Sequence, residues 1–379
     1  MSGIYIHIPF CKQACSYCDF YFITQTGYRN EFVDSLISEI KSYSNTQYVQ
    51  ELVKSVYFGG GTPSLLKPSD LERVMGALHE VFRLDTEEIT LEMNPDDVNK
   101  DYLKELLNLG ITRSSMGVQS FKPELLEFMN RAHTREHALK CLELLQSTGF
   151  RTFTVDLIYG NPGQDLQDLE EDLETLIDFD PPHVSAYSLT VEPKTKLGKQ
   201  VELGRIDPPG DEVVSDHYDM VVEKLADAGI QQYEVSNYSK PGHEAIHNSS
   251  YWRHENYLGL GPAAHSFWWD NEEARRWSNR SDLKAYLEEG KPATLDEKET
   301  LTLLQLAEER LMLGLRTREG VPRKELNERY NYRLNSRQLE YIHQKEKENK
   351  FIIDSETLRL TAQGRKIADS ILLDIVTMH

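Results

Sequence analysis

The segment Cys11-Lys12-Gln13-Ala14-Cys15-Ser16-Tyr17-Cys18 contains three of the four cysteines of the chain, spaced C-x3-C-x2-C. It directly follows an apolar run at residues 4–10. Alternation within that run predicts a strand over residues 3–7, with Tyr5 and His7 on one face and Ile4, Ile6 and Ile8 on the other. We expect His7 to be a hydrogen-bonded core histidine. The strand therefore leads into a loop that carries three thiols.

Three kinds of site use clustered thiols, and the sequence favours one of them. Disulfides are disfavoured because the three thiols are an odd number, the spacings are tight, and no secretory signal precedes them. A structural zinc site usually needs four ligands, and the remaining Cys141 lies in an apolar helical pattern that predicts a core thiol. An iron–sulfur cluster held by three thiolates leaves one iron open, and the amino and carboxylate groups of S-adenosylmethionine suit that iron.

The spacing of these cysteines, with the aromatic Tyr17 just before the third, resembles the signature of the radical S-adenosylmethionine superfamily. The resemblance implies that Cys11, Cys15 and Cys18 bind a 4Fe-4S cluster. It also implies S-adenosylmethionine as a cofactor, whose sulfonium an electron from the cluster would cleave to a 5′-deoxyadenosyl radical.

The composition limits the partners that the chain could have. It has 379 residues, with 42 basic and 62 acidic side chains and a formal charge of -20. Such an excess of acid disfavours nucleic acid as a partner, and no apolar run is long enough to span a membrane. Thiols kept for a cluster imply a reducing compartment, so we expect a soluble protein of the cytoplasm.

Up to about residue 235 the sequence alternates strands with amphipathic helices, which predicts an α/β fold with parallel strands. Together with the resemblance, this pattern predicts a partial (β/α)6, TIM-like barrel over residues 1–235. We expect its strands at residues 3–7, 55–58, 89–93, up to 119, 152–158 and 183–189. Ser69 is the expected N-cap of the helix after the second strand, and residues 191–209 are expected to form a surface excursion.

Several residues near the ends of these strands match the cofactor pocket of the family that the chain resembles. The glycine run with Gly60, Gly61 and Thr62 follows the second strand, where many members carry an acid in place of the threonine. The resemblance implies that this run binds S-adenosylmethionine. It implies the same role for Tyr5, Tyr17, Glu92, Gln119, Arg131 and Asp156.

The closest resemblance over nearly the whole chain is to the oxygen-independent coproporphyrinogen III oxidase-like group, and within it to a heme chaperone branch. Phe20 stands where the oxidases carry a further cysteine, and His247-Asn248-Ser249-Ser250-Tyr251-Trp252 matches the H-N-x-x-Y-W motif of the chaperone branch. The resemblance implies heme as a ligand and His247 as its tentative axial ligand. A purely structural histidine is the alternative, and His243, His254 and His265 compete for the role.

Residues 236–294 are expected to form an extension that carries this motif, after a strand at 232–236. Residues 295–379 differ in pattern, with helices expected at 296–313, 323–330 and 336–345, strands at 351–353 and 358–360, and a last helix to residue 376. This order predicts a mostly helical, winged-helix-like domain. At this net charge we expect it to dock protein or to act as a lid.

The expected function is that of a heme chaperone, which passes heme to an acceptor protein, a respiratory protein being one candidate. An electron donor is the second expected partner, and membrane association is expected only through partners. The cluster and the cofactor serve a redox or gating step, and radical formation on a substrate stays open. The alternative function is an oxygen-independent coproporphyrinogen III oxidase, and an RNA-modifying radical enzyme is disfavoured by the charge. No catalytic residue is assigned.

Overall fold

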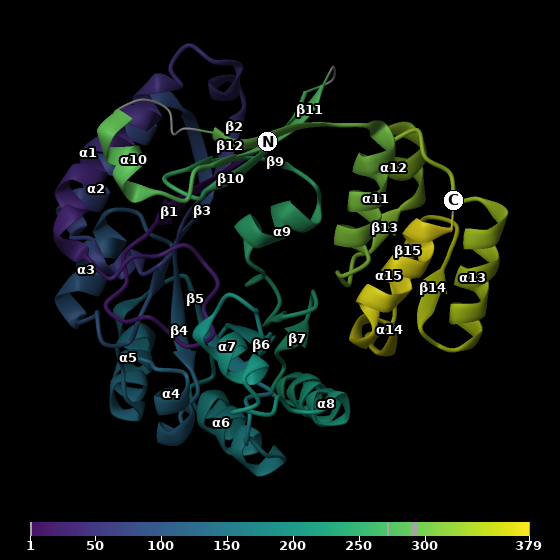
Figure 1. Cartoon of the computed structure of the whole chain (residues 1–379). Helices are drawn as coiled ribbons and strands as arrows, with labels where there is room; N and C mark the ends of the chain where they lie inside the picture. The colour runs from purple at the N-terminus through teal and green to yellow at the C-terminus, as the bar shows by residue number, and fades with distance from the viewer. Residues whose placement is uncertain (1, 271–272, 290–294, 379) are drawn as a thin grey trace.

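The computed structural model describes residues 2–270, 273–289 and 295–378, and its centre is a curved 12-stranded sheet (Figure 1). Six neighbouring parallel strands form the predicted partial barrel. They are β1 (Ser2–Ile8), β2 (Leu52–Gly60), β3 (Arg83–Met93), β4 (Arg113–Gln119), β5 (Thr152–Tyr159) and β6 (His183–Ser188).

Amphipathic helices connect these strands and cover the outer face of the sheet (Figure 1). They are α1 (Arg29–Ser42), α2 (Pro68–Val81), α3 (Lys100–Asn108), α4 (Pro123–Phe128), α5 (Arg135–Thr148), α6 (Leu166–Asp178) and α8 (Asp211–Asp227), with short 3₁₀ helices η1 (Thr26–Tyr28), η2 (Gln47–Gln50) and η3 (Pro63–Leu65). Ser69 is not the N-cap of α2, as the sequence suggested. Lys67 takes that position because Pro68, whose fixed φ suits the first turn, starts the helix.

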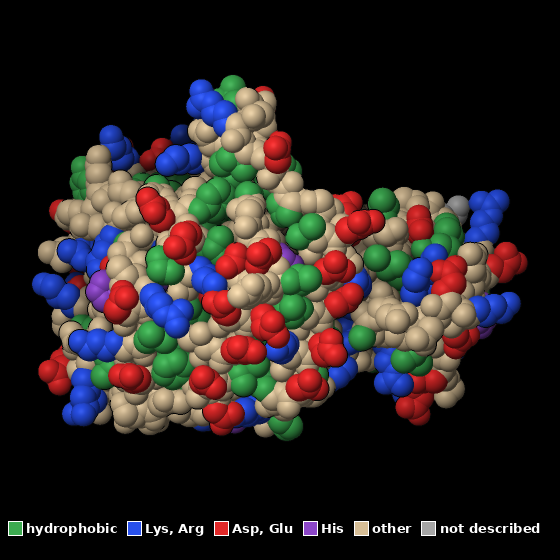
Figure 2. Space-filling model, turned by 90° about the horizontal axis from the view of Figure 1, so that it is seen from below, with side chains coloured by type: hydrophobic (Ala, Val, Ile, Leu, Met, Phe, Trp, Pro, Cys, Tyr) green, Lys and Arg blue, Asp and Glu red, His purple; other side chains and the backbone are tan. Residues whose placement is uncertain are grey.

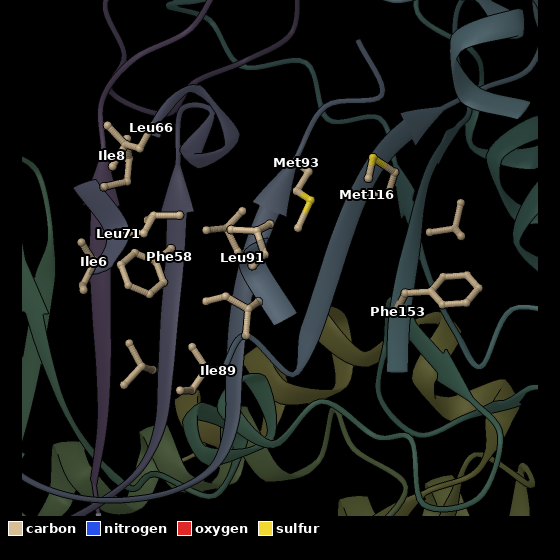
Figure 3. Close-up of a cluster of buried hydrophobic side chains, with 14 of the residues drawn as sticks. Ile6, Ile8, Phe58, Leu66, Leu71, Ile89, Leu91, Met93, Met116 and Phe153 are labelled. Carbon is tan, nitrogen blue, oxygen red and sulfur yellow. The ribbon is translucent and has the colours of Figure 1, made fainter. Parts of the chain in front are cut away.

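The main core lies between the sheet and this layer of helices. Figure 3 shows Ile6 and Ile8 of β1 beside Phe58 of β2 and Leu91 of β3, and all four side chains are buried. The predicted alternation in β1 is confirmed, since His7 faces the other way and its Nε2 lies 2.8 Å from the carbonyl oxygen of Tyr21. Cys141 is also a buried core thiol, as predicted.

Two segments differ from the sequence-based expectation in this half of the chain. Residues 191–209 include α7 (Lys196–Glu202), whose Leu197 is buried, so they are not only a surface excursion. The single strand expected at 232–236 is instead a hairpin of β7 (Gln231–Gln232) and β8 (Asn237–Ser239), which pair antiparallel. A buried carboxylate, that of Glu234, accepts hydrogen bonds from Ser236 and Asn237 within this turn, which a continuous strand would not allow.

After the hairpin the chain returns to the other edge of the barrel. Helix α9 (Ile246–Trp252) precedes β9 (Asn256–Leu260), which pairs parallel with β1, and β10 (His265–Trp269), β11 (Ala274–Asn279) and β12 (Leu295–Leu301) continue the sheet antiparallel. Helix α10 (Leu283–Glu289) lies between the last two strands in sequence. The helix expected at 296–313 is therefore wrong in its first part. The described side chains at 298–300 are exposed, and charged residues are typical of an edge strand.

The C-terminal domain forms a smaller lobe with its own core, and it has the predicted winged-helix-like arrangement (Figures 1 and 2). Its elements are α11 (Leu303–Gly314), β13 (Val321–Pro322), α12 (Arg323–Glu328), α13 (Ser336–Lys347), β14 (Phe351–Ile353), β15 (Thr357–Leu360), α14 (Ala362–Lys366) and α15 (Ala368–Thr377). The domain limits 1–235, 236–294 and 295–379 stay a prediction, because β12 continues the large sheet beyond residue 294. Among the described helices, none is long and apolar enough to cross a membrane.

Candidate functional site

The loop with the three cysteines leaves the carboxyl end of β1 and is fixed by backbone contacts to other connections of the barrel. The amide of Ser16 donates to the carbonyl of Met129, and its hydroxyl donates to that of Phe128, both at 3.0 Å. The carbonyl of Ser16 accepts from the amide of Leu197 in α7 at 2.8 Å. Two distant segments, residues 128–129 and α7, therefore help to set the shape of a loop that has little structure of its own.

The three thiols are free and half-buried, and polar groups donate to two of them. The hydroxyl of Thr62 lies 3.5 Å from Cys11 Sγ, and Nη1 of Arg131 lies 3.4 Å from Cys15 Sγ. Burial raises the pKa of Cys11 and of Cys18 to about 11. Donors aimed at sulfur stabilise thiolates, and iron displaces the thiol proton when it binds. This donor set fits a 4Fe-4S cluster.

Arg131 joins the thiols to the strand ends of the barrel. Its Nη2 donates to Asn94 Oδ1 at 2.6 Å and to the carbonyl of Gly117 at 2.8 Å, while Nη1 also reaches the hydroxyl of Tyr17 at 3.5 Å. Its Nε is buried without a hydrogen-bond partner among the described residues. An arginine with one unused buried donor, beside three thiols, fits a site that accepts an anionic group.

The glycine run after β2 lets the cysteine loop pack closely against this strand. A Cβ on Gly60, whose φ is +105°, would lie 2.6 Å from the ring of His7, and one on Gly61 would lie 2.7 Å from the carbonyl oxygen of Phe10. The requirement for glycine thus comes from contact with β1 and its loop. The same packing brings Thr62 to Cys11.

Two half-buried carboxylates lie on the barrel strands in this region, that of Glu92 near the end of β3 and that of Asp156 within β5. Glu92 accepts hydrogen bonds from the hydroxyl of Tyr57 at 2.7 Å and from the amide of Gly60 at 3.1 Å, and burial raises its pKa to about 7. Asp156 accepts from the hydroxyl of Ser115 at 3.2 Å, and burial raises its pKa to about 6. Carboxylates so placed suit the hydroxyl and amino groups of a nucleoside-like cofactor.

The expected cofactor residues do not all lie together. Thr62, Tyr17 and Arg131 gather around the thiols, while Gly60 and Gly61 pack against His7 and Phe10. Gln119 holds a strained φ of +68° at the end of β4, and Asp156 lies beside Gly117 in the strand register. Tyr5 and Glu92 instead face a large cavity. Their binding of S-adenosylmethionine stays a prediction.

That cavity, of about 1160 Å³, lies between the barrel, α9 and α11. Figure 1 shows α9 between the sheet and the C-terminal domain. The lining is rich in aromatic side chains and carries three cations. These lining residues include Phe20, Tyr21, Phe22, Tyr57, Tyr251, Tyr257 and Phe267, with Lys194, Arg276 and Arg316.

His247 borders this cavity but is fully buried. Its Nδ1 lies 2.8 Å from the hydroxyl of Ser55, its Nε2 lies 2.8 Å from that of Tyr251, and its ring stacks on Tyr57. Burial lowers its pKa to about 4, so the imidazole is neutral. Both ring nitrogens are already engaged. A direct bond to iron therefore requires the ring to leave one of these partners.

The start of α9 depends on residues that the sequence did not single out. The carboxylate of Glu88 accepts hydrogen bonds from the amides of Ile246 and His247, each at 3.0 Å, and pairs with the buried Arg113. Both charged residues lie in strands, where a pattern search expects apolar residues at buried positions. A charged residue at a position where the strand pattern expects a buried side chain was the signal that could have identified Glu88 and Arg113.

Comparison with known proteins agrees with this geometry. The model of the radical SAM superfamily matches residues 5–176, and that of the HemN C-terminal domain matches residues 301–367. The superfamily implies a 4Fe-4S cluster and S-adenosylmethionine as cofactors. Coproporphyrinogen III oxidase (HemN) from Escherichia coli has the same fold, with a TM-score of 0.83 at 22% identity over 100% of this chain and 90% of that one.

Relatives with higher identity cover most of the chain. The heme chaperone HemW of Bacillus subtilis is 38% identical over 343 residues, 88% of each chain, and that of Lactococcus lactis is 32% identical over 98% of this chain and 96% of its own. The mitochondrial radical S-adenosyl methionine domain-containing protein 1 of Danio rerio is 33% identical over 99% of this chain and 87% of its own. The resemblance seen in the sequence is confirmed, and the chain belongs to the HemW family of the radical S-adenosylmethionine superfamily.

Proposed function

We propose that the protein is a heme chaperone, which binds heme in the cavity between the barrel and the C-terminal domain and passes it to an acceptor protein. The cavity itself carries this proposal, because it is large, apolar in much of its lining and open at one side. Phe20, at the position where the oxidases carry a further cysteine, is 71% exposed and lines this cavity. An exposed aromatic ring suits stacking on a flat macrocycle.

The names of the relatives support the same function, since proteins at 32% and 38% identity are heme chaperones. Heme carries two carboxylates, and Lys194 at the cavity is exposed, with no ion pair within the part of the chain that the structure describes. It is the cation that we assign to a propionate. Arg276 and Arg316 are less suited because acidic side chains already pair with them.

In this proposal Cys11, Cys15 and Cys18 hold the cluster, which supplies an electron when it is reduced. Arg131 and Thr62 donate to the thiolates and hold the loop against the barrel. Glu92 and Tyr5, which we expect to bind S-adenosylmethionine, also line the cavity, so that cofactor and the heme would be neighbours. An electron donor and an acceptor, for which a respiratory protein is a candidate, are the partners, and we place the protein in the cytoplasm.

The alternative is an oxygen-independent coproporphyrinogen III oxidase. The fold shared with HemN favours it, because the same architecture accommodates a porphyrinogen. Two observations favour the chaperone function over the oxidase. Phe20 stands where the oxidases carry a cysteine, and the relatives with higher identity are named heme chaperones.

The two functions separate in one experiment. The reconstituted protein is titrated anaerobically with hemin and followed by absorbance, and conversion of coproporphyrinogen III is assayed on the same samples. We expect saturable binding near one heme per chain and no conversion. Conversion with only non-saturating heme uptake would overturn the proposal in favour of the oxidase.

Phe20→Ala tests whether the exposed ring contacts the bound heme. Loss of the exposed ring should weaken heme binding roughly fivefold, because an aromatic contact contributes about 1 kcal/mol to the binding free energy. Leu203→Ala is the matched variant, because Leu203 is 61% exposed and does not line the cavity. It should bind heme as the unaltered protein does.

A further inference from the structure

Four histidines line the cavity that we assign to heme, namely His7, His247, His254 and His265. A neutral imidazole nitrogen is a common axial ligand of heme iron, but only if that nitrogen is free to face the iron. The four rings differ in this respect. Their burial and hydrogen bonds therefore indicate which of them can bind.

His7 and His254 are also buried and already contact polar partners. His7 is buried, with Nε2 at 2.8 Å from the carbonyl of Tyr21 and Nδ1 at 3.3 Å from the hydroxyl of Tyr5. His254 is buried with Nδ1 at 3.1 Å from the hydroxyl of Tyr330, and its Nε2 lies 3.3 Å from Glu309. Each of these rings holds parts of the structure together. Binding iron would break those contacts.

His265 is exposed, and its ring has no hydrogen-bond partner among the residues that the structure describes. It is the first residue of β10, after a turn in which Gly261 packs against the backbone of His7. Because β9 runs parallel to β1, this turn lies at the same edge of the sheet as the loop of Cys11. A free imidazole thus stands at the mouth of the barrel, on the cavity side.

We propose that His265 is the axial ligand of the heme iron, through one nitrogen of its ring. The inference rests on the proposed function and specifies the ligand of that same site. No electron is transferred in this step, since the imidazole lone pair forms the bond to iron and displaces a weaker ligand such as water. His247 is then a positioning residue, which orients Tyr251 at the cavity wall through its 2.8 Å hydrogen bond.

The test compares heme spectra of His265→Ala, His247→Gln and the unaltered protein, each titrated with hemin. His343→Ala is the matched control, because His343 is an exposed histidine on α13, outside the cavity. Glutamine at position 247 can keep hydrogen bonds to Ser55 and Tyr251. We expect the nitrogen-ligated absorbance and EPR signature to be lost only in His265→Ala and to return on addition of imidazole.

The outcomes separate this inference from the proposed function. If the unaltered protein takes up no heme, the proposed function fails. If it binds heme and His265→Ala keeps the signature, only the ligand assignment is wrong. Loss of the signature in His247→Gln, with His265→Ala unchanged, would return the role to His247. Thermal unfolding of each variant checks its folding, and because His265 is exposed, its removal should leave the midpoint unchanged.

Discussion

The surroundings of Glu92 change the pKa of its carboxyl group. It lies at the end of β3, where it accepts hydrogen bonds from Tyr57 and from the amide of Gly60. Burial and, to a lesser extent, the nearby charge of Asp156 raise its pKa to about 7. The folded chain therefore holds a proton on Glu92 that the unfolded chain has already lost at pH 6.

This shift predicts how the stability of the cofactor-free protein depends on pH. Because the folded state binds the proton more tightly, the contribution of Glu92 to the free energy of unfolding decreases as pH rises from about 4.5 to about 7, and is constant above. Glu92→Gln removes this dependence and should be the more stable protein at pH 8, by roughly 2 kcal/mol. Urea unfolding at pH 5 and pH 8 measures the difference.

Glu80→Gln is the control for this prediction. Glu80 lies on α2 with its side chain 65% exposed, so its loss should leave the pH dependence as it is in the unaltered protein. An identical slope in Glu92→Gln and in the unaltered protein would show that the buried carboxyl does not titrate in this range.

At the residue scale, the sequence predicted those parts of the site whose residues are close together in the chain. The three cysteines and the glycine run are adjacent in sequence, and the structure places Thr62 and Arg131 beside the thiols. The hydrogen bond from His247 to Ser55 and the stacking of its ring on Tyr57 could not be predicted, because both partners come from β2, almost two hundred residues earlier.

At the scale of single elements, α9 shows how a short helix is held in place. It has 7 residues, too few to be stable alone, and no side chain of its own caps it. Glu88 of β3 accepts the first free amides instead, and Arg113 of β4 pairs with Glu88 and donates to the carbonyl of His243 at 2.6 Å. Although burial opposes ionisation, Arg113 and these amides keep the pKa of Glu88 below its ordinary value.

Removing one partner of this pair should therefore be costly. Arg113→Met leaves a buried carboxylate without its cation, for which we expect a loss of about 3–5 kcal/mol in the free energy of unfolding. Urea unfolding measures this loss. The double variant Glu88→Gln with Arg113→Met should lose less than the sum of the two single variants, because the two side chains interact directly.

Arg73→Met provides the matched control, since Arg73 pairs with Asp34 at the surface, where their side chains are 48% and 67% exposed. We expect a loss below about 1 kcal/mol. Equal losses in Arg73→Met and Arg113→Met would mean that the buried pair does not hold α9.

At the scale of the whole molecule, the C-terminal domain closes one side of the cavity. Glu309 of α11 pairs with Arg276 of β11 at 2.5 Å and lies 3.3 Å from His254. A second contact, between the amide of Arg318 and the carbonyl of Tyr233 at 2.8 Å, joins the domain to the other end of the sheet. Figure 1 shows α11 facing α9 across this boundary.

Loss of the first contact should loosen the domain on the cavity side. In Glu309→Ala we expect amide exchange in α11 to become about tenfold faster, as for a loss of about 1.4 kcal/mol, while exchange in β1–β6 is unchanged. Hydrogen–deuterium exchange with mass spectrometry measures both regions. In Glu328→Ala, which removes an exposed pair with Lys324 inside the same domain, exchange in α11 should not change. Equal exchange in both variants would contradict the role of Glu309.

The sequence by itself determined the family, the barrel with its parallel strands, and the thiol loop, because each depends on short-range periodicity or on residues adjacent in the chain. Only the tertiary structure decided that residues 295–301 form an edge strand and that Glu88 and Arg113 hold α9. It also decided which histidine is free, because the motif pointed to His247 whereas the structure shows both ring nitrogens of His247 engaged and the ring of His265 exposed. Exposure and hydrogen-bond partners come from segments far apart in the chain, and no local pattern encodes them.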